Sequence, residues 1–310
     1  MYLYVLGHSE DELELAQAEA QNLAPGKMVH QRILLSASKI DPASTGYITM
    51  AAELICSAPS LEELATLLQR NIVTSQNFRI DVKKIPSALR MQSRDIAGRI
   101  AYEIRGNPNL DNPSEVFLAV ATETAVWLGR RLSVGQSEWR TFHDKLFDFS
   151  SALPSRMARA VVNLAAVPGQ TLADPCCGSG TIILNAAQRG MKVTGWDINQ
   201  RMVWMSQKNM RHFGLCGDVE LGDASQVTGS FDAVATNLPY GNFCRITPEQ
   251  YRDILANCRH LAPRLVLVAA TPSRDILEDV GYEIEKVIHT GRTVAHRIIY
   301  CCRLPTSLIK

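Results

Sequence analysis

The feature that most constrains the fold is a stretch where a strand ends in an acid, a glycine loop turns and a helix begins. Residues 172–181 read LADPCCGSGT. Glycines in such a loop let a ligand approach the backbone, because no Cβ stands in the way. The third glycine of the dinucleotide fingerprint is absent, and an acid before the loop would repel a pyrophosphate. The stretch therefore predicts a sheet edge that binds a ligand carrying an ammonium group.

From residue 156 the chain alternates between helical and strand patterns. Such alternation is typical of a doubly wound, Rossmann-like parallel sheet, which places this part of the chain in the α/β class. The last two strand patterns predict an antiparallel hairpin at one edge. We expect helices at 156–165, 181–188, 201–212 and 248–258, and strands at 171–173, 192–195, 219–221, 233–236, 265–270, 283–289 and 295–303.

Two further acids follow the next strands of this pattern. Asp197 ends the second strand, where a carboxylate accepts hydrogen bonds from both hydroxyls of a ribose. Asp223 follows the third strand, where a carboxylate can accept from the amino group of adenine. Together with the acid before the glycine loop, they predict S-adenosylmethionine as the cofactor. The candidate cofactor-binding residues are Asp174, Cys176, Gly178, Ser179, Gly180, Thr181, Asp197, Ile198, Asp223, Ala224 and Asn237.

The turn after the fourth strand carries the candidate catalytic residues. Residues 236–241 read TNLPYG. The amide oxygen of Asn237 and the backbone carbonyl of Leu238 can accept both hydrogens of a planar exocyclic amine, which aims the nitrogen lone pair at an electrophilic methyl group. Pro239 stiffens the turn, and Tyr240 offers a ring on which a flipped-out base stacks. The turn predicts methyl transfer to an amine.

The first half of the chain has a different organisation. We expect a small α+β unit at 1–70, a second α+β unit at 71–140, a linker at 141–155 and the α/β domain at 156–310. Between residues 70 and 105, eight Lys and Arg stand against three acids, whereas the whole chain has a formal charge of only +1. Charge runs are commonly solvated faces, but a local basic surface is also the footprint of nucleic acid. The candidate RNA-binding residues are Arg79, Lys83, Lys84, Arg90 and Arg94.

The chain resembles a known family at these motifs. Residues 172–181 and 236–241 resemble the amino-methyltransferases that carry an (N/D)PP(Y/F) motif, with Leu238 in place of the first proline as in guanine-N2 tRNA methyltransferases. Residues 153–165 are similar to the segment that leads into their catalytic domain. Residues 78–130 are similar to a THUMP domain, an RNA-binding module, and a ferredoxin-like unit precedes it. This order resembles the archaeal-type tRNA guanine-10 N2-methyltransferase family.

The resemblance implies an S-adenosylmethionine-dependent enzyme that methylates the exocyclic N2 amine of a guanosine in tRNA. Asn237 and the Leu238 carbonyl would orient the amine, and Asp174, Asp197 and Asp223 would hold the cofactor. Other amino-methyltransferases use the same turn, so methylation of adenine N6 or cytosine N4 in DNA or another RNA, or of a protein glutamine, stays open. A catalytically silent RNA-binding protein with this fold is the alternative from another class.

Composition and spacing exclude several other classes. The eight cysteines form no CxxC pair and the seven histidines no HxxxH pair, so we expect no metal. No apolar stretch approaches the roughly 20 residues of a membrane span, and residues 1–7 resemble a first strand rather than a signal peptide. We therefore expect a cytoplasmic monomer that binds tRNA and no membrane.

Overall fold

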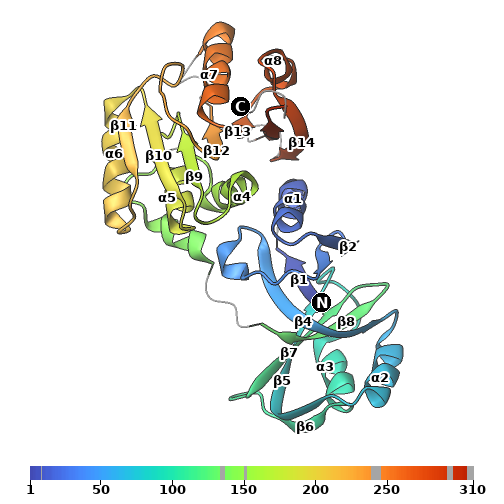
Figure 1. Ribbon diagram of the computed structural model, residues 1–310. Coiled ribbons are helices and arrows are strands. Elements are labelled where there is room, and N and C mark those ends of the chain that lie inside the picture. The colour runs from blue at the N-terminus through green and yellow to red at the C-terminus, as the bar shows by residue number, and fades with distance from the viewer. Residues whose placement is uncertain (8, 133–136, 150–151, 239–245, 292–295, 306–310) are drawn as a thin grey trace. The chain divides into compact units, whose positions relative to one another are not determined.

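The computed structural model describes residues 1–7, 9–132, 137–149, 152–238, 246–291 and 296–305 (Figure 1). The chain divides into two units, each described by itself. The first unit comprises residues 1–7, 24–42 and 48–135, and the second comprises residues 8–23, 43–47 and 136–310. Two short stretches near the N-terminus therefore belong to the same unit as the C-terminal half. Within the described residues, no helix is both long and apolar enough to cross a bilayer.

The first unit is built on an eight-stranded sheet with the order β2-β3-β1-β4-β8-β7-β5-β6. The β5–β6 and β5–β7 pairs are parallel, and the other pairs are antiparallel. The strands are β1 Tyr2–Leu6, β2 Gly26–His30, β3 Ile33–Ser36, β4 Ile48–Ala58, β5 Thr74–Lys84, β6 Arg105–Pro108, β7 Glu115–Ala121 and β8 Val126–Arg131, and the helices are α2 Leu61–Arg70 and α3 Ser93–Ala101.

Helices α2 and α3 give the first unit its main core. Leu64 of α2 and Ile96 and Ile100 of α3 are fully buried against Phe78 and Phe117 of the sheet. A side-chain cap starts α2, because the Ser60 hydroxyl accepts a hydrogen bond from the Glu63 backbone N–H at 3.2 Å. A second buried strip crosses the opposite face of the sheet and comprises Leu3, Val5, Ile33, Ala52, Ile85, Leu118, Val120 and Trp127.

The sheet runs through both segments that the sequence assigns to separate units. Strand β4 pairs with β8 from Ala52–Arg131 to Ala58–Val126, so residues from 1–70 and 71–140 share one ladder. The division at residue 70, with a ferredoxin-like unit before it and a THUMP-like unit after it, stays a prediction.

The second unit contains the doubly wound sheet that the sequence predicts. Its order is β11-β10-β9-β12-β13-β15-β14. Strands β9 to β13 are parallel, and β15 is antiparallel to both β13 and β14, which confirms the terminal hairpin. The strands are β9 Thr171–Asp174, β10 Lys192–Asp197, β11 Asp218–Leu221, β12 Ala233–Asn237, β13 Arg264–Ala269, β14 Glu283–Thr290 and β15 Arg297–Arg303.

The helices of the second unit cover both faces of this sheet. One face packs on α7 and α8 through Leu255, Cys258 and Leu277, while α4, α5 and α6 contact strands β9 to β13. Because both faces are covered, the central strands are apolar throughout, and every residue of β13 after Arg264 is buried. The helices are α1 Leu13–Leu23, α4 Ser155–Ala165, α5 Thr181–Gln188, α6 Gln200–His212, α7 Pro248–Leu261 and α8 Arg274–Asp279, with 3-10 turns η1 Glu10–Glu12, η2 Pro42–Ser44 and η3 Glu138–Asp144.

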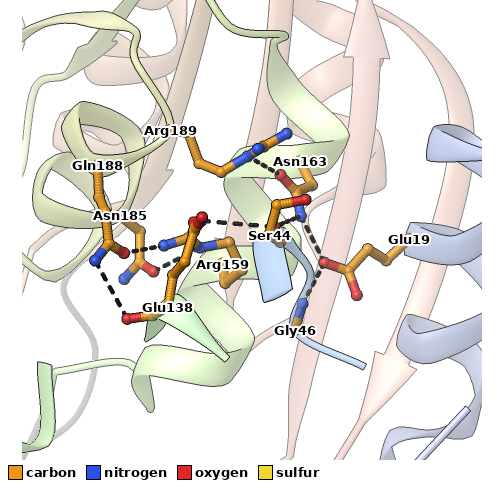
Figure 2. Close-up of polar contacts among 9 residues, drawn as sticks. All are labelled: Glu19, Ser44, Gly46, Glu138, Arg159, Asn163, Asn185, Gln188 and Arg189. Atoms are coloured by element: carbon orange, nitrogen blue, oxygen red, sulfur yellow. Dashed lines mark hydrogen bonds and ion pairs between the residues drawn. The ribbon is translucent and has the colours of Figure 1, made fainter. Parts of the chain in front are cut away.

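A buried polar network ties the N-terminal stretches to α4 (Figure 2). The carboxylate of Glu19 on α1 accepts hydrogen bonds from the backbone N–H groups of Gly46, at 2.7 Å, and Tyr47, at 2.9 Å. It also accepts from Nδ2 of Asn163 on α4, at 2.7 Å. Glu19 and Asn163 are 0% and 1% exposed, and burial raises the pKa of Glu19. Residues 8–23 and 43–47 therefore join the second unit through polar groups as well as through apolar packing.

The same network continues to α5 through Arg159, which is fully buried. Its guanidinium donates to Oδ1 of Asn185 at 3.0 Å, to Oε2 of Glu138 at 2.9 Å and to Oε1 of Gln188 (Figure 2). Burial lowers the pKa of Arg159 to about 10, and the charge of Glu138 acts in the opposite direction. Arg159 thus fixes α4 against α5 and η3.

Candidate active site

The glycine loop lies between β9 and α5 at the carboxyl edge of the sheet. Gly178 and Gly180 have φ angles of +54° and +91°, in the left-handed region that favours glycine. A Cβ on Gly180 would lie 2.4 Å from the Ser206 hydroxyl oxygen of α6, whereas a Cβ on Gly178 would meet nothing within 4 Å. Gly180 therefore allows close packing against α6, and Gly178 leaves open space beside the backbone.

Asp174 ends β9 with a carboxyl group that is 1% exposed. Its Oδ1 accepts hydrogen bonds from the Thr236 hydroxyl at 2.8 Å and from the Cys176 backbone N–H at 3.2 Å. Burial raises the pKa of Asp174 to about 7, although both hydrogen bonds act in the opposite direction. A cation bound beside this group would therefore stabilise its ionised form.

Asp197 ends β10 and holds the glycine loop from the neighbouring strand. Its Oδ2 accepts from the Gly178 N–H at 3.0 Å and its Oδ1 from the Asn199 N–H at 2.8 Å. Burial raises its pKa, and the two N–H groups oppose the shift. Each carboxylate oxygen can accept a further hydrogen bond. Ile198 beside it is 74% exposed, so an apolar side chain lies uncovered next to this carboxylate.

The third predicted acid has a more local role. Oδ1 of Asp223 accepts from the backbone N–H of Ser225 at 2.9 Å and from its hydroxyl at 2.7 Å. The methyl of Ala224 lies in the core cluster, and its carbonyl accepts from Nδ2 of Asn257 at 3.0 Å. The side chain of Ala224 therefore points into the core.

The Asn237 turn ends β12, directly beside the strand that carries Asp174. Oδ1 of Asn237 is buried and has no hydrogen-bond partner among the described residues. A buried acceptor is destabilising unless a donor pairs with it, and a ligand with an amine is one such donor. Leu238 is 1% exposed, and its N–H donates to the Val268 carbonyl at 3.3 Å. Two predicted residues of this turn, Pro239 and Tyr240, lie outside the described residues.

Strand order explains why these groups meet. Strands β10 and β12 lie on either side of β9. The chain first adds strands on one side of β9 and then on the other, so the strand order reverses at β9. At such a switch point the loops leave in opposite directions and open a crevice where ligands bind. The hydrogen bond from Thr236 to Asp174 joins the two halves of the site directly. The predicted cofactor loop and the predicted catalytic turn are therefore neighbours.

The sequence reasoning missed a segment that contacts the glycine loop. Residues 145–149 lie within the predicted linker, yet the Phe147 backbone exchanges two hydrogen bonds with the side chain of Asn209, at 3.0 and 2.8 Å. Asn209 is fully buried and also donates to the Ser179 carbonyl at 2.9 Å. The sequence signal that could have indicated this contact is Asn209, a polar residue on the face of α6 that is otherwise buried.

Some of the predicted RNA-binding residues of the first unit already bind other groups of the protein. Arg79 pairs with Asp81 at 2.9 Å, and the ammonium of Lys84 donates to the Leu89 carbonyl at 2.9 Å. Arg94 contacts Asp95 at 3.4 Å in an exposed pair. Arg90 is exposed and Lys83 is half-buried. Among the residues that the structure describes, no three His, Cys, Asp or Glu gather as metal ligands.

The chain is similar to known methyltransferases. Residues 143–280 match the family model described as "RMKL-like, methyltransferase domain". The tRNA (guanine(10)-N2)-dimethyltransferase of Methanothermobacter thermautotrophicus is 26% identical over an alignment 292 positions long that covers 85% of this chain and 87% of that protein. The enzyme of the same name from Pyrococcus abyssi is 31% identical over an alignment 213 positions long that covers 61% of each chain.

A solved structure has the same fold. The crystal structure of TrmN from Thermus thermophilus matches 98% of this chain and 99% of its own, with a TM-score of 0.54 and 18% identity. The α/β methyltransferase fold expected from the sequence is thereby confirmed. Residues 143–280 therefore match the RMKL-like (UPF0020) methyltransferase domain, and the chain is similar to the tRNA (guanine(10)-N2)-dimethyltransferases.

Proposed function

We propose that this protein transfers a methyl group from S-adenosylmethionine to the exocyclic N2 amine of a guanosine in tRNA. The observation that carries the proposal is the buried Oδ1 of Asn237, which has no partner among the described residues and lies one residue beyond the Thr236 that hydrogen-bonds Asp174. Such an acceptor at this place suits an amine donor. The names of the two archaeal relatives support guanine N2 and tRNA as the target.

The residues around the glycine loop suit S-adenosylmethionine. Asp174 would pair with its ammonium, Asp197 would accept from the ribose hydroxyls and Asp223 from the adenine amine. The open space beside Gly178 allows the ligand to approach the backbone. When bound, this cofactor supplies a methyl group on a positively charged sulfur.

The protein's contribution to the reaction is chiefly positioning. Asn237 Oδ1 and the Leu238 carbonyl would accept the two amine hydrogens, and Tyr240 would stack on the base. A strong base is not needed if the proton leaves after transfer, when the methylated amine has become acidic. Alignment of this kind is worth orders of magnitude in rate. Cytoplasmic location and a monomeric state stay predictions.

The test is nucleoside mass spectrometry after incubating unmodified tRNA and duplex DNA with protein and cofactor. We expect N2-methylguanosine from tRNA and no methylated base from DNA. Methyladenine or methylcytosine would instead support the other amino-methyltransferases. A protein that binds tRNA but methylates nothing would be the silent RNA-binding alternative.

A further inference from the structure

A buried lysine lies at the start of α5. The Lys145 side chain is 3% exposed, and its ammonium donates to the Thr181 hydroxyl at 3.0 Å. Its ionic partner is Asp148, at 2.7 Å, whose side chain is 69% exposed. Thr181 is the first residue of α5, directly after the glycine loop. A buried cation thus relies on a solvent-screened carboxylate, a weak compensation for its lost hydration.

The position of this lysine increases the local positive charge. The N-terminus of a helix carries a partial positive charge and unpaired N–H donors. Gly180 is the N-cap of α5 and has no side chain with which to accept from those donors, unlike Ser60 at α2 or Thr247 at α7. The ammonium and the helix end therefore add their positive charges at one place, beside the glycine loop.

A second, independent observation comes from the loop itself. The hydroxyl of Ser179 is buried, its residue is 4% exposed, and it has no hydrogen-bond partner among the described residues. Ser179 lies two residues before Thr181. A buried hydroxyl is normally paired. The ammonium of Lys145, the hydroxyl of Ser179 and the first N–H groups of α5 are all donors, and an anionic acceptor would satisfy them together.

We propose that Lys145 and Ser179 form the subsite for the carboxylate of the methionine part of the cofactor; this inference rests on the proposed function. The amino-acid end of S-adenosylmethionine carries an ammonium and a carboxylate on one carbon. Asp174, at the start of the glycine loop, provides an anion for the ammonium. Lys145, which contacts Thr181 at the end of the loop, provides a cation for the carboxylate.

The structure also explains how a residue from the predicted linker reaches the loop. Asn209 binds both the N–H and the carbonyl of Phe147, two residues after the lysine, and the Ser179 carbonyl. The ring of Phe147 packs on Trp204 at 4.8 Å between centroids. Lys145 and Ser179 are therefore held by the same helix, α6.

The test compares two ligands by calorimetry on the full chain. S-adenosylhomocysteine contains the amino-acid end, whereas methylthioadenosine contains the same adenosine and thioether without it. We expect Lys145→Met to weaken the binding of S-adenosylhomocysteine by about tenfold or more, as for the removal of a charged hydrogen bond. The affinity for methylthioadenosine should stay unchanged. Ser179→Ala should weaken binding less, with the same selectivity. Lys208→Met, a lysine on α6 that lies over Trp204, is the matched control and should change neither.

Equal weakening of both ligands would mean that Lys145 only maintains the loop, and unchanged affinity for S-adenosylhomocysteine would mean that it does not meet the carboxylate; either overturns the inference. If Lys145→Met does not fold, the wild-type protein tests the same point, since it should bind decarboxylated S-adenosylhomocysteine at least about tenfold more weakly than the parent. Failure of the wild type to bind S-adenosylhomocysteine at all would overturn the proposed cofactor itself.

Discussion

At the residue scale, Asp174 and Asn237 are polar groups that lower the stability of the fold and are placed to bind a ligand. Each places a polar group in a buried position where the described residues do not fully compensate it. Asp174 has a pKa near 7 because burial disfavours its charge, and Asn237 has a buried acceptor without a donor among the described residues. Sites that bind ligands are expected to contain such locally unfavourable groups.

Asp174→Asn should change the pH dependence of folding. The ordinary pKa of this carboxyl is 3.8 and its pKa in the fold is about 7. The folded protein therefore holds a proton that the unfolded chain releases, so the free energy of unfolding falls as pH rises from about 4 to 7. The variant lacks this contribution and should be the more stable protein at pH 8, by up to about 4 kcal/mol.

Urea unfolding at pH 5, 6, 7 and 8 measures the effect, with the exposed Asp218→Asn as control. The difference between variant and wild type should grow from pH 5 to pH 7 and then level off. A difference that stays constant with pH would contradict the assigned shift.

Asn237→Ala should separate catalysis from cofactor binding. Because Oδ1 has no donor among the described residues, its removal should leave folding stability unchanged or slightly higher. Turnover should fall on the order of 10²-fold because the amine is no longer aligned. Asn237 is also among the predicted cofactor-binding residues, but its Oδ1 is proposed to face the amine, so calorimetric affinity for S-adenosylhomocysteine should stay near wild type. Retention of most activity on tRNA would show that the turn does not orient the amine.

At the scale of elements, local patterns predicted the second unit well. The glycine loop, the four acid or amide positions and the βα alternation depend on residues near in sequence, and the strands formed where they were expected. The network of Glu19, Asn163 and Arg159 left no such pattern, because its partners are distant. Glu19 and Asn163 are 144 residues apart, and nothing local marks a glutamate on α1 as buried. The role of residues 145–149 was missed for the same reason.

Arg159→Met should destabilise the second unit by about 3 kcal/mol, because it leaves a buried acceptor on Asn185 and a half-buried acceptor on Gln188 without their donor. Urea unfolding of the full chain measures this. The matched control is Arg252→Met, whose pair with Asp279 is exposed on both sides and should be worth less than about 1 kcal/mol. Equal effects of the two substitutions would show that the network contributes no more than a surface pair.

At the scale of the whole molecule, the proposed tRNA substrate is a polyanion, and an almost neutral chain would bind it through a local surface. Arg79 and Lys84 already have partners in the first unit, so Lys83 and Arg90 are the better candidates for binding phosphate. Replacing both with Ser should flatten the slope of log K against log salt for tRNA binding. The slope should fall by roughly 0.7–0.9 for each phosphate that the variant no longer neutralises.

Gel shifts across a series of salt concentrations measure this slope. Arg274→Ser, on α8 of the second unit, is the control and should leave it unchanged. An unaltered slope in the double variant would mean that these two side chains are only charges on a solvated surface and do not contact phosphate.

The division of the second unit among three stretches of sequence has a consequence during synthesis. Helix α1 leaves the ribosome early, but its polar and apolar partners on α4 follow more than 130 residues later. At about 5–20 residues per second, the nascent helix waits several seconds or longer with Leu15 and Glu19 uncovered. The first unit, most of whose sequence lies between α1 and α4, can close its own sheet meanwhile. We therefore expect α1 to stay exposed until α4 is synthesised, so an arrested chain that ends before α4 would present this helix to chaperones and proteases.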